Sequence, residues 1–473
     1  MIRSRSNIYL TTFVISLIIA CNYIIQLLHP ITLKIFYYPR ILFCYLIICL
    51  LGSCTSRIYQ NSLAELTTQP QAVLQPADTF LFRSFVDCNM ATVWVRDTFR
   101  IFPGKYGEDP LWGEAHELKF ASGTSTRQVF LTPPEGFVLP QMPPNAPPGK
   151  SGLHGAIWFE ALYKDRSDTS EKTLFALYHN ENYPSTLPYD TISGEGYLDV
   201  NWPQGLKGPE TKTAVCRIGI MKSEDGGYSW HDKGILIEDN QSRLILRPHN
   251  NAINFAGGVG DPSAVASGDY LYVFYGEYGY PGVYEASAYD SIKEWKGQCI
   301  NVARILLSDI DKPSGNAKRW NGKGFDASHN GVGTPVKSLQ IPLAEGGGAA
   351  SSPSAKYYWG PSVSWNDYLN CWVMLMAKAE GPSWKGNSIY ISFNKNKNLG
   401  LSDNSQQWSP PILLLKKDNH TLWYPSLQPV DSPGDLSAKH TSVNLGKKVR
   451  LFFKDMYEDK SPYVSEYFIE FKK

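Results

Sequence analysis

The side chains best suited to chemistry stand beside short apolar runs that are spaced along the chain. Acidic, amide, imidazole and aromatic residues precede five of these runs: Asp87, Asn89, His154, Asp261, Trp359 and Tyr424. Others end the runs that follow: His179, Glu181 and Glu277. If the runs are strands whose ends meet around one axis, several carboxyl groups, two histidines and several aromatic rings share a cavity. Cleavage of a glycosidic bond needs such a set, with one protonated carboxyl group and one carboxylate.

The catalytic candidates are the carboxyl groups of this set, namely Asp87, Asp261, Glu181 and Glu277. We expect other members to hold the sugar, because histidines bond hydroxyl groups and aromatic rings stack on sugar rings. These predicted substrate contacts are His154, His179, Trp359 and Tyr424. Each candidate also has an ordinary structural alternative, such as a turn cap, an ion pair or core packing. No ligand spacing predicts a metal, so we expect no cofactor, while an axial metal ion stays open.

The elements that must position these residues are short strands. Over residues 76–473, β-rich runs alternate with Gly, Pro, Asn and Asp turns, and no long segment has helical periodicity, which predicts an all-β domain. One unit recurs: a turn, a small residue or proline, an apolar strand, a polar turn and an aromatic strand. Its five copies start at Asp87, Leu153, Gly260, Trp359 and Trp423.

A second kind of unit follows three of these copies. It is an outer hairpin with a tryptophan on its returning strand, within Cys216–Trp230, Val302–Trp320 and Ser388–Trp408. Two inner strands and an outer hairpin make a four-stranded antiparallel sheet, which is one blade of a β-propeller. The five copies therefore predict a five-bladed β-propeller that fills residues 76–473.

The amino-terminal segment is predicted to target the protein to a membrane rather than to form part of the folded domain. Residues 1–54 hold basic but no acidic side chains. The apolar run Ile41–Leu51 leads directly into Leu51-Gly-Ser-Cys54, which resembles the lipobox of bacterial lipoproteins. We expect Cys54 to carry a lipid that anchors an exported protein to a bacterial outer membrane or cell surface, with residues 55–75 as a linker. An ordinary anchor helix is the alternative, and Ile8–Leu28 is about long enough to span a bilayer.

The composition excludes several classes of protein. The chain has 45 Lys+Arg against 44 Asp+Glu, so it lacks the basic excess of nucleic-acid binders. A hydrophobic content of 43% excludes wholesale disorder. The body cysteines lie far apart, which excludes a zinc knuckle or a disulfide-dense scaffold; they are Cys88, Cys216, Cys299 and Cys371. We expect a monomer whose partners are a carbohydrate substrate and, through Cys54, a lipid.

Three strand starts share the pattern x-Pro-Ser, at Asp261-Pro-Ser, Gly360-Pro-Ser and Tyr424-Pro-Ser. Together with the acidic cavity and the lipoprotein signal, they resemble the five-bladed propeller glycoside hydrolases of family 43 and its relatives, such as family 117. The resemblance implies that Asp87 is the general base and that Asp261, in Gly-Asp-Pro-Ser, tunes the pKa of another carboxyl group.

The same resemblance leaves the general acid open. Family 43 implies a glutamate, for which the candidates are Glu181, Glu277 and Glu380. Glu380 has the right neighbours, Gly-Pro, but lies in a later blade than the family pattern implies. Family 117-like enzymes imply a histidine instead, either His154 or His179.

Two further motifs resemble sialidases. The segment Ser223–Trp230 matches the Asp-box pattern, in which Asp225 would accept amide hydrogens of a tight turn and have a structural role. Phe99-Arg100-Ile101 resembles the motif whose arginine binds a carboxylate. A six-bladed sialidase-like propeller with exo-sialidase activity is therefore one alternative. A non-catalytic glycan-binding lipoprotein of the same fold is another.

Overall fold

The computed structural model describes residues 69–107, 115–145, 153, 155–182, 214–239, 255–282, 286–400, 406–430 and 445–473. The predicted membrane-targeting segment, which includes Cys54, lies outside the described residues. So does His154, a predicted substrate contact. The chain divides into two compact units, Met1–Gln69 and Pro70–Lys473, and every element below belongs to the second. Among the described residues, no helix has the length and apolar character needed to cross a membrane.

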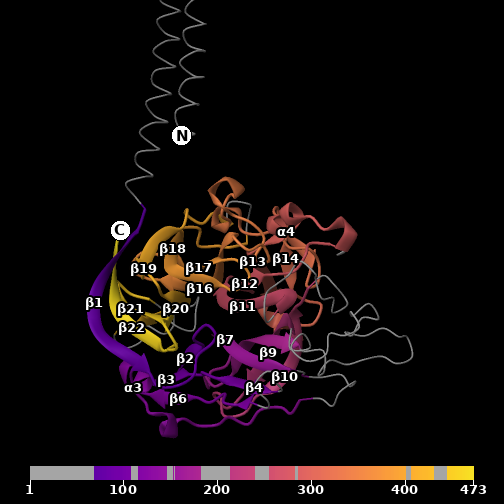
Figure 1. Ribbon diagram of the computed structural model, residues 1–473. Helices are drawn as coiled ribbons and strands as arrows, with labels where there is room; N and C mark the ends of the chain where they lie inside the picture. Colours follow the sequence, from indigo (N-terminus) through magenta and orange to yellow (C-terminus); the bar gives the residue numbers. More distant parts are fainter. Residues whose placement is uncertain are drawn as a thin grey trace, which may run out of the picture. The chain divides into compact units, whose positions relative to one another are not determined.

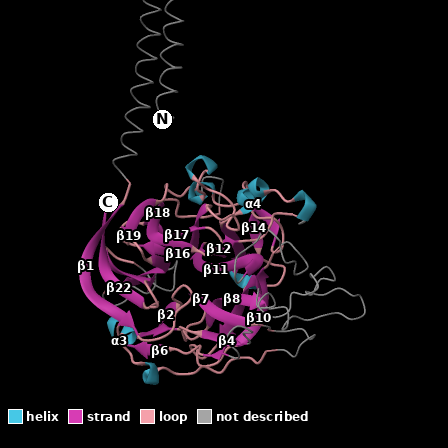
Figure 2. Ribbon diagram, in the orientation of Figure 1, coloured by secondary structure: helices cyan, strands magenta, loops and turns pink. Residues whose placement is uncertain are grey.

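The second unit is built mostly of β-strands, as predicted (Figure 2). Its α-helices within the described residues are short, α3 (Thr126–Phe130) and α4 (Ser291–Gly297). The strands form several sheets in which most pairings of neighbouring strands are antiparallel. The mainly β character that the sequence predicted is confirmed, and several strands are buried on both faces.

The first and last strands of the unit pair with each other. β1 (Gln71–Phe82) lies antiparallel to β22 (Tyr463–Lys472), and the sheet continues through β21 (Lys448–Met456) to β20 (Thr421–Pro429). Figure 1 shows β1, coloured indigo, beside the yellow carboxy-terminal strands. The pairing joins the two ends of the unit, and β1 begins within the segment predicted as a linker.

A second sheet has four antiparallel strands in chain order, as predicted for a blade. Its strands are β16 (Lys356–Asn366), β17 (Cys371–Glu380), β18 (Lys385–Asn394) and β19 (Ile412–Lys416). A third sheet has three strands, which are β2 (Thr92–Val95), β3 (Thr98–Ile101) and β6 (Ala121–Gly123).

The remaining strands form one continuous sheet instead of two separate ones. Its order is β15 (Phe325–Ser328), β14 (Lys318–Trp320), β13 (Ile300–Leu306), β12 (Tyr270–Glu277), β11 (Phe255–Ser267), β9 (Ala214–Ser223), β8 (Leu174–Asn182), β7 (Ala156–Lys164), β4 (Lys105–Gly107) and β5 (Ala115–His116), while β10 (His231–Ile237) pairs with β9. The prediction of separate, wholly antiparallel four-stranded sheets is corrected here, because β9 and β11 pair in parallel. Gly258 permits this pairing: a Cβ there would lie 2.2 Å from the carbonyl oxygen of Cys216.

The positions predicted as strand starts at Gly260, Trp359 and Trp423 lie within strands that begin earlier, and each carries a bulge. The register shifts between Gly260 and Ser263 in β11, between Trp359 and Ser362 in β16, and between Trp423 and Ser426 in β20. The residue before each proline has a positive φ, 51° at Asp261, 57° at Gly360 and 48° at Tyr424. β7 has the same kind of shift between Phe159 and Ala161. A bulge re-aims the side chain that it carries, so these positions point away from the regular sheet faces.

The bulged strands meet around one narrow polar cavity. Residues from the segment before β2 and from β7, β11, β16 and β20 all line it, including Asn89, Glu160, Ser263, Ser362 and Ser426. Five chain segments that lie far apart in the sequence therefore converge on a common centre, as the repeat analysis expected.

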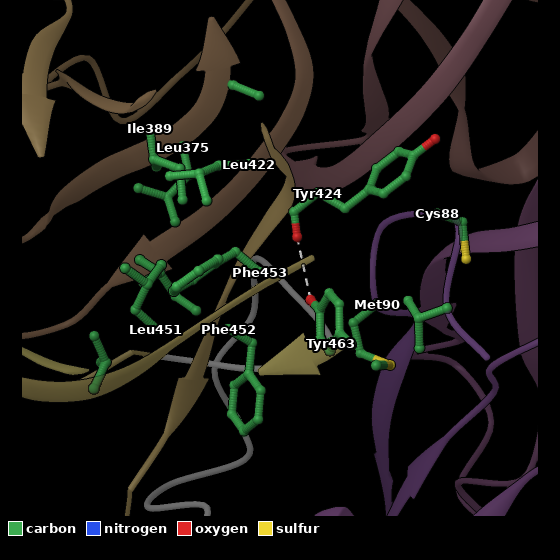
Figure 3. Packing of buried hydrophobic residues seen from close by; sticks show 14 of the residues in the cluster. Cys88, Met90, Leu375, Ile389, Leu422, Tyr424, Leu451, Phe452, Phe453 and Tyr463 are labelled. Atoms are coloured by element: carbon green, nitrogen blue, oxygen red, sulfur yellow. Dashed lines mark hydrogen bonds between the residues drawn. The ribbon is translucent and has the colours of Figure 1, made fainter. Parts of the chain in front are cut away.

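The sheets are held together by apolar side chains between their faces. Figure 3 shows Leu375 and Ile389 of one sheet packed near Leu422 and Leu451 of the next. In the same view, the Tyr463 hydroxyl donates to the carbonyl oxygen of Tyr424 at 3.2 Å. The four body cysteines are buried and form no disulfide bond with one another.

The Asp-box motif stabilises a turn, as predicted. Asp225 accepts hydrogen bonds from the backbone N–H groups of Tyr228 at 2.9 Å and Ser229 at 3.0 Å. Trp230 packs edge-on against Phe159, with 4.8 Å between the ring centroids. This turn joins β9 to β10 on the outer side of its sheet, so the motif has a structural role.

Candidate active site

Three buried side chains from neighbouring bulges and strands form the centre of the site. One donor atom each from Glu160, His179 and Asp261 lies within 4.8 Å of the others. β7 supplies Glu160, β8 supplies His179 and β11 supplies Asp261. All three residues are buried, with exposed fractions of 4%, 4% and 5%. Two carboxyl groups and an imidazole are therefore held together away from bulk water.

Asp261 is fixed by its backbone and by its carboxyl group. Its backbone N–H donates to Nδ1 of His179 at 3.2 Å, and its Oδ2 accepts a hydrogen bond from the Tyr278 hydroxyl at 2.5 Å. Burial raises the pKa of Asp261 to about 7, although the bond from Tyr278 opposes the rise. The group is therefore partly protonated near neutral pH, which suits a proton donor.

His179 is a neutral ring in this setting. Burial lowers its pKa to about 4, so the ring carries no charge at neutral pH. Because Nδ1 accepts the Asp261 N–H, the proton of the neutral ring belongs on Nε2. Nε2 lies 4.0 Å from Oε1 of Glu181, another predicted carboxyl group, whose side chain is 13% exposed. The imidazole thus lies between Asp261 and Glu181, two of the predicted catalytic carboxyl groups.

Glu160 is the carboxyl group that the sequence prediction missed. Its Oε2 accepts a hydrogen bond from the backbone N–H of Asn89 at 2.8 Å. Burial and the neighbouring charge of Asp261 raise its pKa well above the usual range. An acidic residue inside the apolar run Ala156-Ile-Trp-Phe-Glu160-Ala was the available signal, because a glutamate is rarely fully buried without a partner.

Asp87 lies beside this centre in a different environment. Its Oδ1 accepts a hydrogen bond from Nζ of Lys454 at 2.6 Å, and its side chain is 33% exposed. Its charge contributes to the raised pKa values of both Asp261 and Glu160. The site therefore offers one ion-paired, accessible carboxylate next to two buried carboxyl groups with raised pKa values.

Glu277 is engaged elsewhere. Its Oε2 accepts a short hydrogen bond from the guanidinium of Arg319, and Oε1 accepts the backbone N–H of Gly279 at 3.0 Å. Arg319 also donates to the Tyr275 hydroxyl at 2.8 Å. This buried ion pair braces the end of β12, so the structure favours the structural alternative for Glu277. Glu380 is 54% exposed and lies 3.9 Å from Nζ of Lys356 at the surface.

The predicted aromatic contacts are packed into the wall of the site. Trp359 is only 3% exposed, and its ring meets those of Trp384, Trp423 and Tyr424 at centroid distances of 5.2, 5.5 and 5.3 Å. Burial raises the pKa of Tyr424, and the charges of Asp261, Asp87 and Glu160 add to the rise. The hydroxyl of Tyr424 is thus close to the carboxyl groups, while Trp359 mainly supports its neighbours.

Arg100 does not take part in the site. Its guanidinium donates to the carbonyl oxygen of Gly226 in the Asp-box turn and lies over the rings of Phe120 and Tyr228, with centroid distances of 5.6 and 5.1 Å. This contact explains the Phe-Arg-Ile motif by turn packing, which removes the main residue support for a sialidase.

The same three side chains carry the donor atoms of a possible cation site. Their donor atoms are close enough for a shared ligand, although His179 Nδ1 already accepts the Asp261 N–H. Burial favours the protonated form of both carboxyl groups, so a cation would have to displace those protons.

The comparisons with known proteins give distant structural likenesses. The native arabinanase of Bacillus subtilis is 10% identical, with a TM-score of 0.36 over 83% of this chain and 95% of that one. The α-L-arabinanase of Cellvibrio cellulosa is 12% identical, with a TM-score of 0.37 over 80% and 91%. The α-L-arabinofuranosidase of Lactobacillus brevis is 8% identical, with a TM-score of 0.40 over 84% and 90%. No protein-family model and no curated protein sequence matches the chain.

Proposed function

We propose that the unit Pro70–Lys473 is a five-bladed β-propeller that hydrolyses glycosidic bonds. The fold proposal is supported by the five chain segments around one polar cavity and by the pairing of β1 with β22, which joins the ends of the repeat array. In a propeller, the loops before the innermost strands converge at one mouth. Asp87 precedes β2 in this way, while Glu160 and Asp261 lie at the bulges within β7 and β11.

The observation that carries the functional proposal is the different environments of adjacent carboxyl groups. Asp261 is buried and has a pKa of about 7, while Asp87 is ion-paired with Lys454 and one-third exposed. Carboxyl groups whose environments favour different protonation states can divide the roles of acid and base. Glycoside hydrolysis requires that division of roles.

Asp261 is the proposed general acid and Asp87 the proposed base or nucleophile. The proton of Asp261 passes to the glycosidic oxygen while the bond from that oxygen to the anomeric carbon breaks. Asp87 either takes a proton from the attacking water or bonds to the anomeric carbon itself. Burial and the charge of Asp261 raise the pKa of Glu160, so Glu160 stays protonated beside the proposed acid. Glu181 and His179 line the same side and are the proposed contacts to sugar hydroxyl groups.

The substrate class is an oligosaccharide or polysaccharide. The aromatic wall of Trp384 and Trp423, both half-buried, supplies partly accessible ring surface next to the carboxyl groups. Aromatic rings of this kind stack against the apolar faces of sugars. Trp359 packs behind this wall, so we propose that it acts through Trp384 and Trp423.

The test is hydrolysis of defined polysaccharides and oligosaccharides by the purified chain. Released reducing sugar is measured for the wild type and for Asp261→Asn, Asp87→Asn and Glu277→Gln. We expect each of the first two variants to lose about 100-fold or more in kcat. Glu277→Gln serves as a comparison that perturbs a buried ion pair without removing a proposed catalytic group. Any decrease in its activity should match the decrease in its folded fraction. Unchanged turnover in both aspartate variants would refute the catalytic assignment.

A non-catalytic glycan-binding protein is the second candidate, favoured by the deep burial of Glu160 and Asp261. Calorimetric binding to the same panel separates the two functions, because a binding protein retains glycans without cutting them. The proposed lipid on Cys54 is tested by mass spectrometry of the mature protein expressed in a bacterium. An unmodified Cys54 would refute the anchor and leave the enzymatic proposal intact.

A further inference from the structure

Tyr278 is a buried residue that follows β12 and reaches back to the proposed acid. Its hydroxyl donates to Oδ2 of Asp261 at 2.5 Å, and its backbone N–H donates to the carbonyl oxygen of Gly258 at 2.8 Å. The other oxygen of Asp261, Oδ1, lies 4.0 Å from Nδ1 of His179. The two carboxyl oxygens of Asp261 therefore have different surroundings, and Tyr278 is hydrogen-bonded to Oδ2.

The backbone leaves room for this arrangement at two paired glycines. Gly260 of β11 and Gly276 of β12 are register partners. A Cβ on Gly276 would lie 2.1 Å from the Tyr278 hydroxyl, and a Cβ on Gly260 would lie 2.5 Å from Nδ1 of His179. Any side chain at either position would displace the group that holds Asp261. The two glycines are thus explained by the contacts of Tyr278 and His179.

Trp384 holds the Tyr278 ring from its outer side. The two rings meet edge to face, with 4.6 Å between centroids and an angle of 83°. Trp384 has a positive φ of 57°, and its carbonyl oxygen accepts a hydrogen bond from Nε1 of Trp423 at 2.8 Å. A tryptophan held in this sparsely populated backbone conformation indicates that its surroundings fix its position.

We propose that Tyr278 is the positioning residue of the proposed acid: its hydroxyl holds Oδ2 of Asp261, so that Oδ1 is the oxygen that delivers the proton. The inference rests on the proposed hydrolase function and adds a residue that acts through Asp261. When the proton of Oδ1 passes to the glycosidic oxygen, the C–O bond breaks and Asp261 is left as a carboxylate. The hydrogen bond from Tyr278 strengthens at that moment, because a donor binds a carboxylate more tightly than a carboxyl group.

Other titratable groups also face Asp261, and they set the background for its protonation. They come from the elements packed around it: Asp87, Glu160, His179, Cys216, Tyr357 and Tyr424. Among the hydrogen bonds described for these groups, only that of Tyr278 reaches the Asp261 carboxyl group directly. Removal of the Tyr278 hydroxyl therefore changes one direct contact and leaves the surrounding charges in place.

Tyr278→Phe is the test, with Tyr357→Phe as its matched control. Both tyrosines are buried and both contact Trp384, but the Tyr357 hydroxyl donates to the carbonyl oxygen of Gly381 at 2.8 Å. Loss of one hydrogen bond to a developing charge predicts a decrease of about 10- to 100-fold in kcat for Tyr278→Phe, with KM within about 2-fold of wild type. In the wild type the bond from Tyr278 lowers the pKa of Asp261, so its loss raises that pKa. The basic limb of the kcat–pH profile should therefore move to higher pH. Tyr357→Phe should leave that limb where it is.

A second readout does not depend on hydrolysis. The carboxyl carbon of Asp261 is followed by NMR in protein labelled with [13C]aspartate, and its signal is assigned by its loss in Asp261→Asn. A titration midpoint that rises in Tyr278→Phe but not in Tyr357→Phe supports the inference, even if no glycan is cut, in which case the hydrolase proposal fails alone. An Asp261 titration and a kcat that both match wild type in Tyr278→Phe would overturn the inference.

Discussion

Asp87 and Lys454 lie 367 positions apart in the sequence and form an ion pair, with 2.6 Å between Oδ1 and Nζ. The Lys454 ammonium also lies over the rings of Phe85 and Trp423, with centroid distances of 5.4 and 5.6 Å. The pair therefore joins the start of the first repeat to the last sheet and holds one candidate catalytic carboxylate in place.

The two partners of this pair differ in exposure, which predicts an asymmetry between variants. Asp87→Asn leaves the Lys454 ammonium, 5% exposed, without its counter-ion and should cost about 3 kcal/mol in the free energy of unfolding. Lys454→Met leaves Asp87, 33% exposed, in contact with water and should cost about 1 kcal/mol. The double variant should be more stable than Asp87→Asn. Urea unfolding measures all three, and equal costs for the single variants would contradict the assigned burial.

Glu160→Gln should leave the proposed acid nearly unchanged, in contrast to Tyr278→Phe. The amide keeps an acceptor for the Asn89 N–H, and burial together with the charge of Asp261 already raises the pKa of Glu160 well above its usual range. Glu160 is therefore uncharged while Asp261 titrates, so a neutral amide in its place should leave the basic limb of the kcat–pH profile where it is. Glu380→Gln, a change at the exposed end of β17, is the control. A basic limb that moves in Glu160→Gln but not in Glu380→Gln would rule out a neutral Glu160.

Asp261 should also impose a pH dependence on stability. Its pKa is about 7 in the folded protein against 3.8 in the unfolded chain, so the folded state binds more protons between these values. The contribution of Asp261 to stability is thus fully present below about pH 4 and is lost as the pH rises through 7. Asp261→Asn should remove this loss and flatten the curve of unfolding free energy between about pH 4 and 7. Asp269→Asn, in an exposed turn, should retain the wild-type slope.

The Asp-box turn should affect stability without affecting the site. Asp225→Ala removes the acceptor for two backbone N–H groups and for the Ser229 hydroxyl, which donates at 2.7 Å. We expect a loss of about 2–3 kcal/mol in the free energy of unfolding and an unchanged KM. Glu224→Ala, at the neighbouring and 70% exposed side chain, should change stability little. A raised KM in well-folded Asp225→Ala would assign the turn a role in binding.

Local pattern predicted much of the framework. Alternating apolar runs and turn residues predicted the β-strands, and the x-Pro-Ser repeats marked equivalent positions of β11, β16 and β20, although the bulges found there were not predicted. The parallel pairing of β9 with β11 was not predicted, because a close backbone approach at Gly258 leaves little trace in the sequence. The three-stranded sheet of β2, β3 and β6 was likewise decided by pairing across turns of unequal length.

The sequence by itself determined the strand repeat and the acidic positions of its recurring units, because period-two patterning and turn residues depend on neighbouring residues. Only the tertiary structure decided which carboxyl groups meet. It placed Glu160 with Asp261, although their repeats are a hundred positions apart, and it placed Glu277 against Arg319 instead. The physical reason is that burial and charge pairing arise from segments brought together by folding, and the same carboxyl group becomes a proton donor or half of an ion pair according to the side chains that fold against it.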